Sequence, residues 1–498
     1  MLLPIGLAQN ADLSIDWGPV HKQFADARPQ FVGLSENGHY VQTRISRHLY
    51  EIRRFDENMD LVASKRISLI PYGQKRDFVD LVMMQGRLYL FSTYQVPMQN
   101  EEILLMEKLD PISLTIVSEA RMLEKIKKSR NTGFKIRVSN NEESMLIFTR
   151  TSPRGKDFES YVCRVYDEDF EEIWSEEVEL PYKNRLFTIK DVRVSNQGDV
   201  FVSGRLRESA AEKRAKQKVG SEDRSHYSYK LLSYRNQGTE AREYGLDLRE
   251  DFIIGFQYEL GRGNDIICGG FYAERRQEIK GVFSFSIDGE SGEIRDLHQT
   301  AFSGEFIRKM IGERRERNGR GLAEYELRDI VVRSDGGLSL IGERFFIREY
   351  CYSVGGVWFE HTDYHYLDII LVNVNPDGSV AWYENIPKRQ VSGSQLYSSY
   401  QMAIGRDKLF FLFNDHIKNK SSGRARPRKA RNFARNEKGH LGLVSVDANG
   451  NLTKASLGNL KELGVALVPS LSTQYDHDEV LVYGRRRRKY RYGSLKLY

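Results

Sequence analysis

Residues 191–204 read Asp191-Val-Arg-Val-Ser-Asn-Gln-Gly198, followed by Asp199-Val-Phe-Val-Ser-Gly204. Each half alternates polar and apolar residues, as a strand with one buried face does. The Asn-Gln-Gly step between the halves contains residues that tolerate the backbone conformations of tight turns. This stretch therefore predicts two short strands joined as a β-hairpin.

The same hairpin recurs along the chain. Its clearest copy is Asp329-Ile-Val-Val-Arg-Ser-Asp-Gly336 with Gly337-Leu-Ser-Leu-Ile-Gly342, and weaker copies lie at 31–45, 78–94, 134–149, 252–271, 400–414 and 472–484. A second hairpin follows most copies, with turns such as Asn375-Pro-Asp-Gly378 and Asp447-Ala-Asn-Gly450. The repeating unit is therefore four antiparallel strands, A to D in chain order, in roughly 50 to 70 residues.

Repeated units of this kind resemble the β-propeller superfamily, in which each four-stranded sheet forms one blade. The resemblance covers nearly the whole chain and implies an all-β fold with a single propeller domain over residues 10–498. No particular family is favoured, because WD dipeptides, kelch double glycines and sialidase-type Asp boxes do not recur. We expect eight blades, with seven blades and an appended strand pair as the alternative.

The last unit begins near Ser472 and ends before a D strand. The segment Leu13-Ser-Ile-Asp-Trp-Gly-Pro-Val20 has a strand pattern but no unit of its own. We expect this N-terminal strand to supply the missing D strand and to close the ring, which would protect the sheet edges.

Composition and cysteine content exclude several protein classes. The chain has 498 residues, of which 40% are hydrophobic and 29% are charged, so it is neither a disordered tail nor a coiled coil. Cys163, Cys268 and Cys351 are too few and too widely spaced for a disulfide framework or a zinc site. Glycine-rich phosphate loops and nucleophile elbows are absent from the sequence, and we expect no cofactor.

Residues 1–9, Met1-Leu-Leu-Pro-Ile-Gly-Leu-Ala-Gln9, resemble the end of a secretory signal without its basic segment. We therefore expect export to the periplasm or the cell exterior, with a cytoplasmic protein that has an apolar N-terminus as the alternative. The sequence has no apolar run long enough to predict a transmembrane segment.

The long insertions all follow B or D strands. They are 206–227, 304–324, 345–366, 415–439 and 485–492. Because the B–C and D–A connections lie on the same face of a propeller, we expect one loop-rich face, chiefly on blades 4 to 8. Extended loops on a rigid scaffold commonly carry binding function.

Two of these insertions are rich in arginine. The segment 418–438 has nine basic residues and one acid, Glu437. Its net charge of +8 exceeds the net charge of +6 on the whole chain. The candidate binding residues in the two segments are Arg424, Arg426, Arg428, Lys429, Arg431, Arg435, Arg485, Arg486, Arg487 and Arg488. Since a guanidinium group binds carboxylate, sulfate or phosphate through two parallel hydrogen bonds, these residues indicate an anionic partner. A solvated charge run without a ligand is the alternative.

The insertion 345–366 is aromatic. Its candidate binding residues are Tyr350, Tyr352, Trp358, Tyr364 and Tyr366. Aromatic faces stack on sugars, bases or peptides, whereas a long hairpin that packs its own rings is the alternative. In the same segment His361, Asp363 and His365 alternate, as weak candidate metal ligands. Because no fourth ligand accompanies them, we predict no metal site.

The sequence thus favours a non-catalytic binding or scaffold protein, whose basic and aromatic loop face holds an anionic polysaccharide or an acidic protein surface. Nucleic acid is a less favoured partner. A hydrolase or lyase with carboxylates in the central channel is one alternative, and a structural module of a larger assembly is another. We expect a monomeric propeller or one subunit of an assembly.

Overall fold

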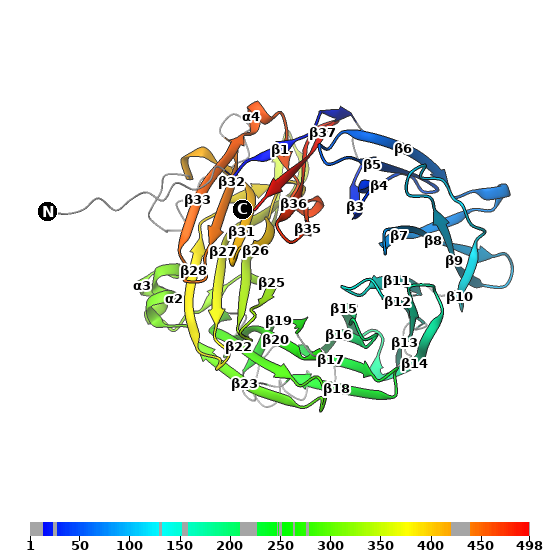
Figure 1. Ribbon diagram of the computed structural model, residues 1–498. Helices are drawn as coiled ribbons and strands as arrows, with labels where there is room; N and C mark the ends of the chain where they lie inside the picture. Colours follow the sequence, from blue (N-terminus) through cyan, green and yellow to red (C-terminus); the bar gives the residue numbers. More distant parts are fainter. Residues whose placement is uncertain are drawn as a thin grey trace.

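The computed structural model describes residues 13–22, 27–128, 132–151, 158–209, 227–246, 248, 251–261, 264–274, 278–419 and 439–497. These residues form antiparallel sheets arranged around a common centre (Figure 1). Six sheets have four strands, one has five and one has six, and we number them 1 to 8 in chain order. The predicted all-β, β-propeller fold is confirmed.

Sheets 1 to 4 follow one another along the chain, each with its strands in sequence order. Sheet 1 contains β3 (Pro29–Ser35), β4 (Gly38–Ser46), β5 (Leu49–Phe55) and β6 (Leu61–Ser68), and sheet 2 contains β7 (Arg76–Met84), β8 (Arg87–Val96), β9 (Glu101–Leu109) and β10 (Arg121–Lys127). Sheet 3 contains β11 (Gly133–Val138), β12 (Ser144–Arg150), β13 (Phe158–Asp167) and β14 (Glu172–Lys183), and sheet 4 contains β15 (Phe187–Val194), β16 (Val200–Arg207), β17 (Tyr227–Arg235) and β18 (Glu240–Leu246).

Sheets 5 to 7 continue this order. Sheet 5 contains β19 (Phe252–Leu260), β20 (Ile266–Ala273), β22 (Gly281–Ile287) and β23 (Ile294–Ala301). Sheet 6 contains β25 (Tyr325–Val332), β26 (Leu338–Val354), β27 (Val357–Val374) and β28 (Val380–Ile386), with β29 (Gln390–Ser392) beside β27. Sheet 7 contains β30 (Gln401–Gly405), β31 (Lys408–His416), β32 (Gly439–Val446) and β33 (Leu452–Asn459). A separate two-stranded ladder joins β21 (Glu278–Ile279) to β24 (Leu322–Ala323).

Sheet 8 combines both ends of the chain. It contains β34 (Ala466–Leu467), β35 (Thr473–Asp476), β36 (Glu479–Arg486) and β37 (Lys489–Lys496), together with β1 (Ile15–Trp17) and β2 (His21–Lys22). Strand β1 runs antiparallel to β37, with Ile15 opposite Leu495 and Trp17 opposite Gly493. The N-terminal strand thus occupies the D position that the last repeat lacks.

The hydrophobic core lies between neighbouring sheets. Leu338 and Leu340 of β26 pack with Phe271 of sheet 5. Ile341, which points to the other side of the same strand, packs with Phe411 of sheet 7. Because successive side chains of a strand face opposite ways, a sheet between two others is apolar on both faces.

The A strands lie nearest the centre of the ring (Figure 1), and several of them contain a β-bulge at the same place. The ladder register shifts between Phe31 and Gly33 in β3, Phe78 and Asp80 in β7, Ile189 and Asp191 in β15, Ile253 and Gly255 in β19, and Leu327 and Asp329 in β25. A bulge bends its strand and redirects the adjacent side chains. It therefore controls what each A strand presents to the centre.

The long connections follow B or D strands. One D–A connection carries helices α2 (Gly304–Ile311) and α3 (Glu313–Arg317), and another carries α4 (Leu460–Leu463). Short 3-10 turns lie at η1 (Pro71–Gly73), η3 (Ile417–Asn419) and η6 (Pro469–Leu471). The expectation of a long loop at 485–492 was wrong, because β36 and β37 run through this segment and a tight turn joins them. Among the described residues, no helix is long and apolar enough to cross a membrane.

Candidate ligand cavity in the central channel

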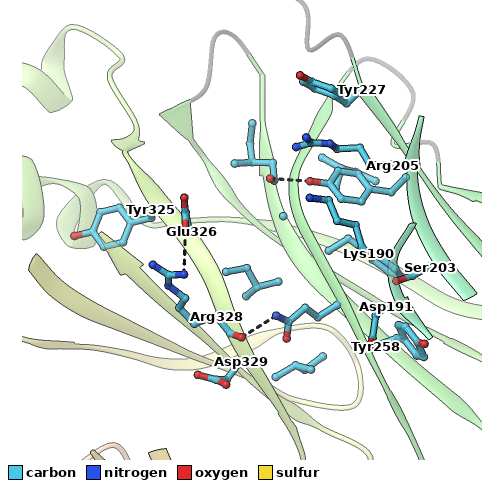
Figure 2. A pocket seen from close by; sticks show the side chains of 18 of the residues that line it. Lys190, Asp191, Ser203, Arg205, Tyr227, Tyr258, Tyr325, Glu326, Arg328 and Asp329 are labelled. Carbon is cyan, nitrogen blue, oxygen red and sulfur yellow. Dashed lines mark hydrogen bonds and ion pairs between the residues drawn. The ribbon is translucent and has the colours of Figure 1, made fainter. Parts of the chain in front are cut away.

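A cavity of about 860 Å³ lies between the A strands of sheets 4, 5 and 6 (Figure 2). Strand β15 and the end of β16 form one wall, β19 forms the middle, and β25 forms the opposite wall. We call it the channel cavity. Its volume is within the range of pockets that hold small molecules.

Most charged groups of the channel cavity are already paired. Arg193 lies between two carboxylates, with Nε 2.6 Å from Asp191 and Nη1 2.7 Å from Glu259. On the opposite wall, Arg328 pairs with Glu326 at 3.1 Å. Gln257 of the middle wall donates a hydrogen bond to the carbonyl oxygen of Arg328 at 2.8 Å. These contacts connect the three strands. The ion pairs among them neutralise the charges of Arg193 and Arg328.

Lys190 and Arg205 are different. Both line the channel cavity, and among the described residues no carboxylate lies within ion-pair distance of either side chain. Burial lowers the pKa of Lys190, and the nearby Arg205 charge lowers it further, against an opposing effect of Glu326. Arg205 stacks over the Tyr227 ring at 4.0 Å. We call Lys190 and Arg205 the cationic pair (Figure 2).

The β-bulge explains why the cationic pair faces the cavity. Lys190 is the extra residue between Ile189 and Asp191, where the register between β15 and β16 shifts. Arg205 lies in the partner strand, opposite Thr188. A regular strand would have placed Lys190 and Asp191 on opposite faces, but both line the cavity.

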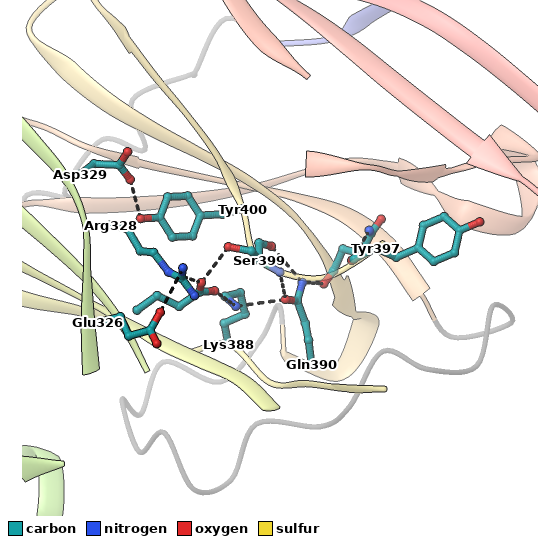
Figure 3. A network of polar contacts seen from close by, with 10 residues as sticks. Glu326, Arg328, Asp329, Lys388, Gln390, Tyr397, Ser399 and Tyr400 are labelled. Carbon is teal, nitrogen blue, oxygen red and sulfur yellow. Dashed lines mark hydrogen bonds and ion pairs between the residues drawn. The ribbon is translucent and has the colours of Figure 1, made fainter. Parts of the chain in front are cut away.

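A buried polar network supports the β25 wall (Figure 3). The Glu343 carboxylate forms ion pairs with Lys388 at 2.6 Å and with Arg328 at 3.3 Å. It also accepts a hydrogen bond of 2.7 Å from the Ser399 hydroxyl. Gln390 accepts a further hydrogen bond from Lys388 at 3.1 Å. The network attaches the connection between sheets 6 and 7 to the cavity wall, so that Arg328 is held from both sides.

Asp329 is a carboxyl group of the cavity lining with a shifted pKa. Burial raises its pKa, while a hydrogen bond of 2.7 Å from the Tyr400 hydroxyl partly offsets that effect. A carboxyl group with a raised pKa can serve as a proton donor in catalysis. Asp329 is therefore the feature on which the hydrolase alternative depends.

The aromatic insertion is the outer part of the β26–β27 hairpin, which turns at Gly355 and Gly356. Tyr350, Tyr352 and Trp358 are exposed there, with Trp358 at 72%. Tyr364 lies on the same hairpin and is half-buried.

Tyr366 does not belong to this exposed group. It is 7% exposed, and its ring packs on Phe345 with 4.6 Å between centroids. At this point the hairpin enters the packed part of sheet 6, and binding by Tyr366 stays an untested prediction.

His361, Asp363 and His365 do not form a metal site. His361 Nε2 lies 3.1 Å from Asp363, but the His365 ring stacks on Phe346 at 4.4 Å between centroids. Among the described residues, no three His, Cys, Asp or Glu side chains are placed to hold a metal ion together. Alternation along a strand put these residues on one face without bringing them to one point.

The predicted basic residues have different outcomes. Arg424, Arg426, Arg428, Lys429, Arg431 and Arg435 lie outside the described residues. Arg485 is buried at 7% exposure and donates a hydrogen bond to the Ala27 carbonyl oxygen at 2.9 Å, and ligand binding by it stays an untested prediction. Arg486, Arg487 and Arg488 are exposed at the β36–β37 turn.

Sequence reasoning did not identify the cationic pair. Lys190 and Arg205 lie in strand patterns with few charges, whereas the arginine-rich insertions drew attention by their density. A signal was nevertheless present at the β-bulges. The bulge of β3 contains Val32-Gly33, whereas the corresponding bulges of β15 and β25 contain Lys190-Asp191 and Arg328-Asp329. A basic residue in a position that is apolar elsewhere would have indicated the cavity.

Comparisons with known proteins do not name a family. No family model matches the chain, and no curated protein sequence matches it. The WD40 domain of SCAP from fission yeast is similar in structure, with 9% identity, a TM-score of 0.44, and coverage of 100% of this chain and 98% of that one. The β-propeller domain of the Trilobed protease from Pyrococcus furiosus has 11% identity and a TM-score of 0.34, and covers 87% of this chain and 97% of its own.

An enzyme is also among the similar structures. The alpha-L-arabinanase of Penicillium chrysogenum has 12% identity and a TM-score of 0.32, over 66% of this chain and 92% of that one. At these identities the similarity concerns the fold alone. The four-stranded antiparallel sheets around a common centre make the chain a β-propeller protein.

Proposed function

We propose that this protein is a non-catalytic binding protein that holds an acidic group of its partner in the channel cavity. The observation that carries the proposal is the cationic pair, because Arg193 and Arg328 are neutralised, whereas within the described part of the chain Lys190 and Arg205 have no carboxylate partner. Two adjacent cations without an anion repel each other, and an anionic ligand would relieve that repulsion. Arg205 is half-buried, which strengthens its attraction to an anion relative to bulk water, whereas Lys190 is exposed.

The favoured partner is an anionic polysaccharide. Tyr227 and Tyr229 lie beside the cationic pair and provide ring faces and hydroxyl groups next to the charges. A cavity of about 860 Å³ suits a narrow chain better than a flat protein surface. Export would bring the protein to such polymers, and it stays a prediction because residues 1–9 lie outside the described residues.

The test is calorimetric titration of the chain from residue 10 onward with oligogalacturonate, heparin oligosaccharide and neutral dextran. We expect the anionic chains to bind, dextran not to bind, and added salt to weaken binding. Lys190→Gln combined with Arg205→Gln should lower affinity at least about tenfold, or 1.4 kcal/mol.

A matched control removes two positive charges elsewhere. Arg87 and Lys408 are exposed at A–B turns, on the opposite face from the loops. Arg87→Gln combined with Lys408→Gln should therefore leave binding unchanged. Equal loss in both double variants, or equal binding of dextran, would contradict the proposal. Binding of polyglutamate in place of the glycans would shift the partner to an acidic protein.

The same samples test the hydrolase alternative, which rests on Asp329. Release of shorter oligosaccharides by the wild type, and its loss in Asp329→Asn, would establish catalysis. We expect the chains to be bound and recovered at their original length.

A further inference from the structure

A second cavity lies on the other side of the channel, between sheets 8, 1 and 2, with a volume of about 390 Å³. It is lined by Gln30 and Phe31 of β3, Gln42 of β4, Asp80 and Leu81 of β7, and the connection 470–473. We call it the amide cavity. None of its residues lines the channel cavity, so a ligand bound here would be independent of the proposed function.

Asp80 is the first group of the amide cavity that lacks a partner side chain. It follows the β7 bulge, as Asp191 and Asp329 follow the bulges of β15 and β25. Those two aspartates are bonded to Arg193 and Tyr400. Among the described residues, Asp80 accepts a hydrogen bond from the backbone N–H of Leu81, at 2.9 Å, and from no side chain.

The side-chain oxygen Oε1 of Gln42 is the second such group. Gln42 is only 4% exposed, and its side-chain Nε2 donates a hydrogen bond to Gln30 Oε1 at 2.6 Å. Its Oε1 has no hydrogen-bond partner among the described residues. A buried acceptor without a donor costs free energy, and buried amides are rarely left in this state. The cavity therefore presents acceptors that require donors.

We propose that the amide cavity is a second ligand site, which takes a neutral molecule rich in hydroxyl groups, such as a single sugar residue. Hydroxyl groups of the ligand would donate to Asp80 and Gln42, and Ser470 adds a hydroxyl on the opposite wall. The half-buried Phe31 ring supplies an apolar face against which a sugar ring packs. The volume is within the range of small-molecule pockets.

Charge favours a neutral ligand over an ammonium group. Burial raises the pKa of Asp80, and the positive charge of Arg137 is close enough to lower it in part. The carboxylate thus already has a cation in its surroundings, although not in contact. A second cation would be repelled by Arg137, whereas a hydroxyl group would not.

The test is saturation-transfer NMR on the full chain with the methyl glycosides of glucose, galactose, mannose and arabinose, and with ethylammonium as the cationic probe. We expect transfer to at least one glycoside and none to ethylammonium. Gln42→Met, which keeps the side-chain size but removes the amide, and Asp80→Asn should each weaken glycoside binding about tenfold or more.

Two controls separate the outcomes. Gln197→Met changes an exposed glutamine in an A–B turn and should leave the signal intact. Lys190→Gln combined with Arg205→Gln should also leave it intact, so this result does not depend on the channel cavity. The melting temperature of Gln42→Met is measured alongside, because the variant also removes the hydrogen bond that Nε2 donates to Gln30. Absence of transfer to every glycoside, transfer to ethylammonium, or glycoside binding that survives both cavity variants would overturn the proposal.

Discussion

The Lys388 ammonium lies 2.6 Å from a carboxylate oxygen of Glu343, and neither side chain has solvent-exposed surface. The pair stands behind the wall of the channel cavity, where Glu343 also receives Ser399 and Arg328 (Figure 3). A buried pair of this kind is weak evidence for net stability, but its two halves depend strongly on each other. It therefore holds the cavity wall in one arrangement.

We first predict that Lys388→Met lowers the free energy of unfolding by about 3–5 kcal/mol, since Glu343 would remain charged and buried without its main partner. Urea denaturation measures the change. The double variant Lys388→Met with Glu343→Leu should recover most of the loss, because no charge is then left alone. A single variant as stable as the wild type would show that Arg328 and Ser399 suffice to hold Glu343.

The second prediction concerns pH. Because burial raises the pKa of Asp329, the folded chain binds this proton more tightly than the unfolded chain does. The stability that the proton provides is lost as pH rises from about 4 through the raised pKa. Asp329→Asn should therefore be more stable than the wild type at neutral pH and less dependent on pH, as measured by melting temperature from acid to neutral pH.

Asp335 is a control of opposite sign. A hydrogen bond from Arg333 lowers the pKa of this exposed carboxyl group. Its contribution is present at neutral pH and is lost on acidification, so Asp335→Asn should lower stability slightly at neutral pH. A change of the same sign in both variants would contradict the assignment.

The third prediction tests the pairing of the two chain ends. A Cβ atom at Gly493 of β37 would lie 2.5 Å from the Ile15 side chain and 3.2 Å from the Asp16 carbonyl oxygen of β1. Gly493→Val should push β1 away and destabilise the fold by about 1–3 kcal/mol in urea denaturation. Gly133→Val is the matched control, because nothing lies within 4 Å of a Cβ atom at that strand position.

The fourth prediction separates two tyrosines of the β26–β27 hairpin. Tyr366 is 7% exposed and Tyr350 is 47% exposed. Tyr366→Ala should cost about 3–5 kcal/mol through the cavity that it leaves against Phe345, whereas Tyr350→Ala should change stability by less than about 0.5 kcal/mol. Thermal and urea unfolding of both variants measure this difference. Equal losses would mean that the outer hairpin is also part of the core.

The fifth prediction concerns the thiols. Cys163 and Cys268 are buried and Cys351 is exposed, and burial raises the pKa of both buried thiols. A thiol-reactive dye should label the native chain at Cys351 alone and all three cysteines after denaturation. Cys351→Ser should abolish rapid labelling. Rapid modification of a second thiol in the native chain would show local opening of sheet 3 or sheet 5.

The fold could be predicted from the sequence because its information is local. Each hairpin depends on alternation within a strand and on Asn, Asp or Gly at the turn, as in Asp191–Gly204. Even the N-terminal strand of the last sheet followed from a repeat that lacked one strand, although its register came only from the structure. Such patterns can be recognised in the sequence without knowing any distance between sheets.

The cavities could not be predicted in this way. Arg193 and Lys190 are close in sequence and equally basic, yet Arg193 is bonded to Glu259 of the next sheet and Lys190 has no such partner among the described residues. Likewise Tyr350 and Tyr366 are both tyrosines of one hairpin, but only one of them enters the core.

The sequence by itself determined the repeated four-stranded units, their turns and the strand that completes the last sheet. The tertiary structure alone decided which charges are paired and which, among the described residues, are not. The physical reason is range: turn chemistry and strand alternation act between neighbours along the chain, whereas ion pairing and burial depend on distances between sheets that are far apart in sequence.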